Sequence, residues 1–92
     1  MARQQVHVLY SGRVQGVGFR YTVKSLVAGF DVSGTVRNLD DGRVELIAVG
    51  ERDELDAFLQ AITDSGLRRF IRNRELAWGD PGKDLVGFEI VA

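Results

Sequence analysis

A glycine-rich stretch near the amino terminus, Ser11 to Tyr21, holds the residues best suited to chemistry. It places three glycines within seven residues and carries two arginines, Arg13 and Arg20. Glycine lets a backbone turn with positive φ and approach a ligand closely. At the start of a helix, such a loop directs unpaired N–H groups and the positive end of the helix dipole toward one point. The stretch therefore predicts an oxyanion site, with phosphate as the expected anion.

The charge around this loop supports the interpretation. No Asp or Glu occurs from Met1 to Phe30, although the whole chain has a net charge of −1. Arginine stays charged at any working pH and can form two parallel hydrogen bonds to phosphate oxygens. Composition alone leaves a second interpretation open, in which the loop is a tight glycine turn and its arginines are solvated.

The loop does not match the common phosphate-binding motifs. A Walker A loop that starts at Gly12 would need a Lys-Ser or Lys-Thr pair, and none follows at the required spacing. A dinucleotide fingerprint that starts at Gly16 would need glycine or alanine where Tyr21 stands. A cysteine phosphatase loop is excluded because the chain contains no cysteine.

Hydrophobic periodicity predicts the elements that position this loop. Apolar residues at helical spacing predict helices over 20–28 and 53–63, and β-rich or alternating runs predict strands over 5–11, 32–39, 43–49, 70–78 and 86–91. This order predicts an α+β fold, the ferredoxin-like split β-α-β two-layer sandwich, as a single domain over residues 1–92. The sheet is expected to be antiparallel, with four to five strands and both helices on one face.

The composition limits the class of protein. The 12 basic and 13 acidic residues nearly balance, which does not favour a general nucleic-acid or membrane surface. No apolar run approaches the roughly 20 residues that span a bilayer, and the amino terminus lacks the apolar segment of a secretory signal. An RNA-binding domain is disfavoured because the strand over 43–49 has no aromatic residue. We expect a cytoplasmic monomer that binds neither nucleic acid nor a membrane.

Three motifs resemble those of the acylphosphatase family. Residues 12–20, Gly-Arg-Val-Gln-Gly-Val-Gly-Phe-Arg, are similar to the first signature of that family. Gly34-Thr35-Val36-Arg37-Asn38, followed by Asp41-Gly42-Arg43-Val44, resembles the second, and Gly87-Phe88-Glu89-Ile90 resembles the closing strand. The two signatures have the order and spacing of the family, and the resemblance covers almost the whole chain. It implies the same ferredoxin-like fold that the periodicity predicts.

The resemblance also implies an activity, the hydrolysis of acyl phosphates to a carboxylate and inorganic phosphate without metal or cofactor. Arg20 would clamp the phosphoryl group, and Asn38 would hold the attacking water through its side-chain amide. The phosphate oxygens would be bound by the backbone N–H groups of Gln15, Gly16, Val17, Gly18, Phe19 and Arg20. A non-catalytic anion-binding or regulatory domain of the same fold stays open as the alternative. Anion binding alone has no use for a water-orienting amide, so the pair of Arg20 and Asn38 favours the enzyme.

The other polar residues are expected to have structural roles. His7, the only histidine, belongs to no motif and is expected to be structural or exposed. The Asp40-Asp41 pair precedes a glycine and predicts a hairpin turn rather than a metal site. A basic run is expected to form a solvated strand edge, where its charges discourage aggregation. The weaker alternative is that it binds an anionic partner or steers the substrate. This run consists of Arg68, Arg69, Arg72 and Arg74.

Overall fold

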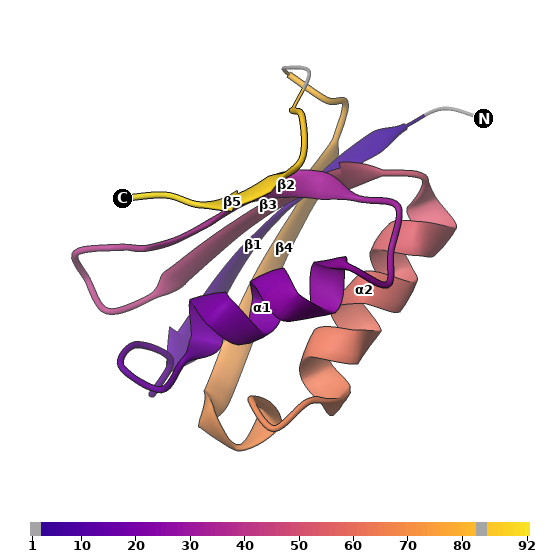
Figure 1. The fold of residues 1–92 in the computed structure, drawn as a ribbon. Helices are drawn as coiled ribbons and strands as arrows, with labels where there is room; N and C mark the ends of the chain where they lie inside the picture. The colour runs from indigo at the N-terminus through magenta and orange to yellow at the C-terminus, as the bar shows by residue number, and fades with distance from the viewer. Residues whose placement is uncertain (1–2, 83–84) are drawn as a thin grey trace.

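Figure 1 shows the computed structural model, which describes residues 3–82 and 85–92 as a sheet with two helices on one face. The elements in chain order are β1 (Gln4–Gly12), α1 (Phe19–Val27), β2 (Ser33–Asn38), β3 (Val44–Gly50), α2 (Arg52–Asp64), the short 3-10 helix η1 (Arg68–Phe70), β4 (Ile71–Gly79) and β5 (Phe88–Ile90). Each predicted helix and strand is found, with its ends shifted by a few residues. The prediction of the ferredoxin-like α+β fold is confirmed.

The direction of the last strand corrects one prediction. The strand order is β4-β1-β3-β2-β5, and β1, β2, β3 and β4 pair in antiparallel fashion. β5, however, runs parallel to β2, so the sheet is mixed and the prediction of an antiparallel sheet was wrong at this edge. The direction of β5 follows from the connection between β4 and β5. β4 ends with Gly79 opposite Gln5, at the end of the sheet where β2 begins, so the chain that follows β4 runs along β2 from its start.

The alternation along β1 decides which face of the sheet forms the core. Val6, Val8 and Tyr10 are fully buried beneath the helices. Helix α1 adds Phe19 and Val23 to the same cluster. Burying an apolar side chain of this size contributes about 1.5–3 kcal/mol, so this face is the main source of stability. The two helices lie next to each other over it (Figure 1).

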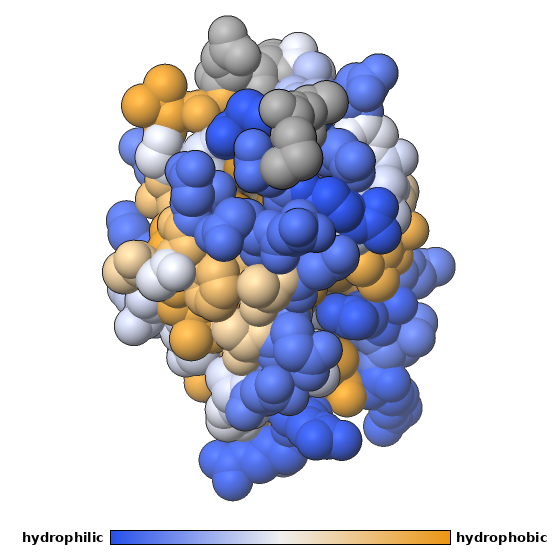
Figure 2. All heavy atoms as spheres, turned by 90° about the vertical axis from the view of Figure 1, so that its right-hand side faces the viewer, coloured by the Kyte–Doolittle hydropathy of each residue, from blue (hydrophilic) through white to orange (hydrophobic). Residues whose placement is uncertain are grey.

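Helix α2 has one buried stripe and one polar face. Leu55, Phe58, Leu59 and Ile62 point into the core at the spacing that predicted the helix. Asp53 and Glu54 lie in its first turn, where negative charge interacts favourably with the helix dipole. Figure 2 views the molecule from the α2 side and shows hydrophilic side chains over most of this face. None of the helices within residues 3–82 and 85–92 is long and apolar enough to cross a bilayer.

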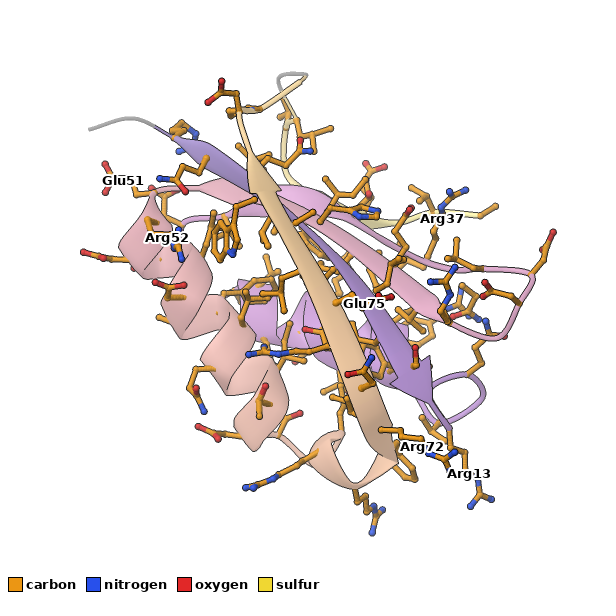
Figure 3. All side chains as sticks on the ribbon, turned by 180° about the vertical axis from the view of Figure 1, so that it is seen from behind. Arg13, Arg37, Glu51, Arg52, Arg72 and Glu75 are labelled. Carbon is orange, nitrogen blue, oxygen red and sulfur yellow. The ribbon has the colours of Figure 1, made fainter. Side chains whose placement is uncertain are left out.

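The face of the sheet without helices, where Figure 3 labels Arg37, carries a small ionic cluster around Glu45. Its carboxylate accepts a hydrogen bond of 2.6 Å from Arg37 Nε and lies 2.9 Å from His7 Nε2. Partial burial raises the pKa of Glu45, but the bonds from Arg37 and His7 together outweigh it, so the pKa lies below its ordinary value. His7 therefore has a structural partner on the open face, as the sequence predicts.

Candidate active site

The loop between β1 and α1 has the backbone conformation that its glycines predict. Gly16 and Gly18 have φ angles of 78° and 80°, in the left-handed region. A Cβ at either glycine would have open space around it, so the backbone angle, and not room, requires glycine here. Gly18 is the N-cap of α1, and the helix begins at Phe19, one residue before the predicted start.

The N–H groups of this loop are available to a ligand. Within residues 3–82 and 85–92, no backbone or side-chain acceptor is hydrogen-bonded to the N–H groups of residues 15–21. The next one, of Thr22, donates to the Gly18 carbonyl at 3.0 Å and starts the helical pattern. The first turn of α1 contains no acidic residue that could occupy these donors. Unpaired donors and the positive end of the helix dipole together form an anion site.

The side chain of Gln15 ties the loop to the hairpin formed by β2 and β3. Its Nε2 atom donates to the carbonyl oxygens of Leu39 at 2.7 Å and of Arg43 at 2.9 Å. The same two residues close the hairpin, because the Leu39 N–H donates to the Arg43 carbonyl at 2.8 Å. This side-chain contact was not anticipated from the sequence, which assigned only the N–H of Gln15. It fixes the loop next to the end of β2, where Asn38 lies.

Asn38 and Arg20 reach the same hollow from different elements. Asn38 pairs with Val44, a fully buried residue, and directly paired residues share one face of a sheet. Asn38 therefore lies on the helix side, where the first turn of α1 carries Arg20. The hollow has a volume of about 110 Å³ and is lined by Val14, Gly16, Gly18, Phe19, Arg20, Tyr21 and Asn38. A water needs about 10–15 Å³ of such space, so a phosphoryl group fits.

The structure thus brings most of the predicted site residues together. Gly16, Gly18, Phe19, Arg20 and Asn38 line the hollow. The side chains of Gln15 and Val17 do not line it, because Gln15 binds the hairpin and Val17 packs against the core. Both were predicted to contribute N–H groups only, and these belong to the unpaired set.

The polar groups of the hollow suit an anion better than a cation. Arg20 takes part in none of the ion pairs of the described residues, which involve His7, Arg37, Arg43 and Arg52. No carboxylate or imidazole lines the hollow. No group of three or more His, Cys, Asp or Glu side chains in residues 3–82 and 85–92 could hold a metal ion. The chemistry on offer is a fixed positive charge, N–H donors and one neutral amide.

The Asp40-Asp41 pair lies in the hairpin turn, as predicted. The Asp41 carboxylate accepts hydrogen bonds from the backbone N–H of Arg43 at 3.0 Å and from its Nε at 2.8 Å. The side-chain bond from Arg43, followed by the backbone bond, holds the pKa of Asp41 below its ordinary value. Asp41 therefore closes the turn.

Two lining residues, Val14 and Tyr21, were missed by the sequence analysis. Tyr21 is 73% exposed and stands beside the hollow, directly after Arg20. Its position in the first helical turn, next to the predicted clamp, is the signal that could have identified it. Phe19, by contrast, is buried, with its ring centroid 5.0 Å from that of Tyr10, so it anchors the loop to β1.

Known proteins match this chain in sequence and in fold over nearly its whole length. The acylphosphatase family model matches residues 6–90. The acylphosphatase of Listeria welshimeri is 45% identical over 94 residues and 99% of each chain. That of Haloarcula marismortui is 38% identical over 90 residues and 98% of each chain. The crystal structure of acylphosphatase from Bacillus subtilis, 32% identical, matches with a TM-score of 0.88 over 97% of this chain and 99% of that one. The chain therefore belongs to the acylphosphatase family.

Proposed function

We propose that this chain hydrolyses acyl phosphates, with Arg20 as the phosphate clamp and Asn38 as the residue that orients the attacking water. The observation that carries the proposal is the shared hollow, where Arg20, the Asn38 amide and N–H groups without a partner in the described part of the chain meet. Membership of the acylphosphatase family supports the substrate class.

In this proposal Arg20 and the loop N–H groups bind the non-bridging phosphate oxygens. The guanidinium offers two parallel donors and a permanent charge, and the backbone of Gln15 to Arg20 offers donors that need no rearrangement. Phosphoryl transfer depends mainly on positioning and on stabilising the charge of these oxygens in the transition state. A rigid loop of unpaired donors provides both.

Asn38 would hold the water in line with the bond that breaks. The water oxygen attacks phosphorus, the bond between phosphorus and the acyl oxygen breaks, and its electron pair leaves with the carboxylate. A carboxylate is a good leaving group, so no general acid is required. The neutral amide of Asn38 can orient water without adding negative charge beside the phosphate. The water proton passes to a phosphate oxygen of the substrate or to bulk water, since the lining residues include no base.

The test compares two variants in the hydrolysis of acetyl phosphate, with and without a chelator. Asn38→Ala should lower kcat by about 10²–10³-fold, or roughly 3–4 kcal/mol, and leave inhibition by inorganic phosphate nearly unchanged. Arg20→Lys should lose most turnover and bind phosphate weakly, because lysine lacks the planar fork. Asn73→Ala serves as the matched control, since Asn73 does not line this hollow.

Three results would contradict the proposal. Equal weakening of phosphate binding by Asn38→Ala and Arg20→Lys would show that Asn38 is a clamp and not a water ligand. Loss of turnover with chelator would show that a metal takes part. A wild-type protein that binds phosphate without any turnover would be the anion-binding domain that the sequence left open as the alternative.

The absence of a base among the lining residues also predicts the pH dependence. We expect kcat to show no side-chain ionisation between about pH 5 and 8. A clear side-chain pKa in the kcat profile would contradict transfer of the proton to the substrate.

Three properties stay predictions: that the enzyme is cytoplasmic, that it is a monomer and that it binds no nucleic acid. Light scattering coupled to size-exclusion chromatography checks the monomer.

A further inference from the structure

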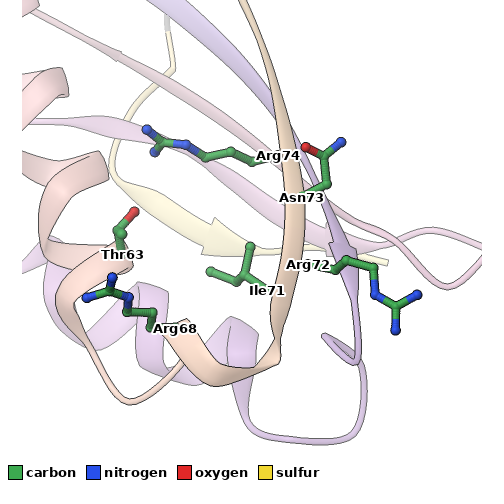
Figure 4. Close-up of a pocket in the computed structure, with 6 residues that line it drawn as sticks. All are labelled: Thr63, Arg68, Ile71, Arg72, Asn73 and Arg74. Atoms are coloured by element: carbon green, nitrogen blue, oxygen red, sulfur yellow. The ribbon is translucent and has the colours of Figure 1, made fainter.

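A second, larger hollow lies between the end of α2 and the start of β4. It has a volume of about 350 Å³ and is shown in Figure 4. Its lining residues are Thr63, Arg68, Ile71, Arg72, Asn73 and Arg74. None of them lines the hollow that holds Arg20 and Asn38, so the two sites are separate. Half of the lining residues are arginines, and none is acidic.

Arg74 occupies a position of the sheet where an apolar residue is expected. The pairs between β1 and β4 on the helix side are Val6 with Trp78, Val8 with Leu76, and Tyr10 with Arg74. Apolar residues thus alternate along this face of β4 until Arg74 interrupts them. Figure 4 shows its side chain extending from β4 toward α2, over the hollow.

The other side chains come from three neighbouring segments. Arg68 reaches the hollow from η1, and Thr63 reaches it from the last turn of α2 (Figure 4). Ile71 points to the same side and packs partly against the core, which gives the hollow an apolar floor. Arg72 and Asn73 point to the other side of β4, so Arg72 adds charge at longer range.

The positive charge in this hollow is not compensated within the described residues. Arg68 and Arg74 take part in none of their ion pairs. The nearest carboxylates along the chain have other partners, because Asp64 accepts a hydrogen bond from Gln60 at 2.9 Å and Glu75 lies 3.8 Å from Arg43.

Tyr10, which pairs with Arg74, supplies no negative charge either. Its hydroxyl is buried and has no hydrogen-bond partner among the described residues. Burial raises the pKa of Tyr10 to about 12, against the smaller opposite effect of the Arg74 guanidinium. Tyr10 is therefore neutral at physiological pH, and the charge of Arg74 remains available to a ligand.

We propose that this hollow is a second binding site, for a small molecule that carries two or more negative charges on neighbouring phosphate or carboxylate groups. Arg68 and Arg74 would each bind one oxyanion group, and the Thr63 hydroxyl would add a donor. A volume of about 350 Å³ fits a small molecule better than a single phosphate, since small-molecule sites measure roughly 300–1,000 Å³.

The test is an NMR titration with pyrophosphate, and a second one with citrate, at constant ionic strength. Side-chain Nε–H signals of Arg68 and Arg74 report this hollow, and amide signals of Gly16 and Gly18 report the catalytic loop. We expect two separate saturation curves. Arg68→Gln and Arg74→Gln should each weaken binding at the second hollow by about tenfold or more and leave acyl phosphate turnover unchanged.

Arg69→Gln is the matched control. It removes the same charge from the residue next to Arg68, but Arg69 does not line this hollow. We expect less than about threefold weakening from it, because exposed charges act weakly through solvent. If all three variants weakened binding of the probes equally, the arginines would form a diffuse basic surface and the proposal of a specific binding site would be refuted. No saturable shift of the Arg68 and Arg74 signals with either probe would also refute it. Binding of only one probe would identify the ligand as a phosphate or a carboxylate compound.

Discussion

The contact between Gln15 and the hairpin yields a prediction with two independent readouts. Gln15→Ala removes two part-buried hydrogen bonds, to the carbonyls of Leu39 and Arg43. Each bond is worth about 0.5–1.5 kcal/mol net. Water can reach these half-buried carbonyls in the variant, so we expect the free energy of unfolding to fall by about 1–2 kcal/mol. For a domain of this size the midpoint of thermal unfolding should drop by about 4–15 °C.

Catalysis should suffer as well, because Gln15 fixes the loop relative to Asn38. A displacement of about 1 Å can cost 10²-fold in rate, so we expect kcat for acetyl phosphate to fall by about tenfold or more. Phosphate binding should change less, since the loop keeps its N–H groups and Arg20.

Urea denaturation and steady-state kinetics on the same samples measure both effects. Gln15→Glu keeps the length of the side chain but cannot donate to a carbonyl, so it should destabilise at least as much as Gln15→Ala. Gln60→Ala is the control, because Gln60 is exposed and its one side-chain hydrogen bond within residues 3–82 and 85–92 is to Asp64 on the same helix. If Gln15→Ala kept both wild-type stability and wild-type kcat, the hairpin contact would have neither role.

Three further predictions concern single positions. Gly34→Ala should lower the free energy of unfolding by more than about 3 kcal/mol, because the added Cβ would clash with the Ile47 carbonyl oxygen. Gly66→Ala is the control: its Cβ would have open space, so urea unfolding should show a change within about 1 kcal/mol. Glu45→Gln should lower the free energy of unfolding at pH 7, and this loss should shrink as the pH falls below 4.5. The reason is that a lowered pKa of Glu45 stabilises the fold while the carboxylate is charged, and protonation removes that stabilisation. Tyr21→Ala should lower kcat/KM for benzoyl phosphate about threefold to tenfold relative to acetyl phosphate, since its exposed ring stands beside the hollow. An unchanged ratio would exclude contact with the acyl group.

Local patterns were sufficient for the elements and for the phosphate loop. The alternation of Val6, Val8 and Tyr10 placed β1 with its core face, and the apolar stripe from Leu55 to Ile62 placed α2. The glycines before α1 predicted positive φ angles, which Gly16 and Gly18 have. These features depend on residues close together in the sequence, so periodicity can detect them.

Features that depend on distant segments could not be predicted in the same way. The direction of β5 follows from where the chain returns after β4, and a three-residue strand has the same pattern in either direction. The bond from Gln15 to Arg43 joins a loop to a hairpin that no local pattern connects. The pairing of β4 with β1 shifts by one residue between Ser11 and Gly12, so that Ile71 and not Arg72 lies on the side of Arg74, and no local pattern predicts that shift. Only the family motif, and no periodicity, drew attention to Asn38.

The position of β1 between β3 and β4 has a consequence for how the chain folds. β1 is made before both of its partners, β3, which begins at Val44, and β4, which begins at Ile71. Its edge toward β4 therefore stays unpaired until residues 71–79 have left the ribosome. Pairing of such distant segments is slow, because the entropy of closing a long loop is lost before the contacts form. A pause in translation before β4 would lengthen the period in which β1 can pair with another chain. The cost of this topology thus falls on nascent chains, whose exposed strands are prone to aggregate, and not on the finished enzyme.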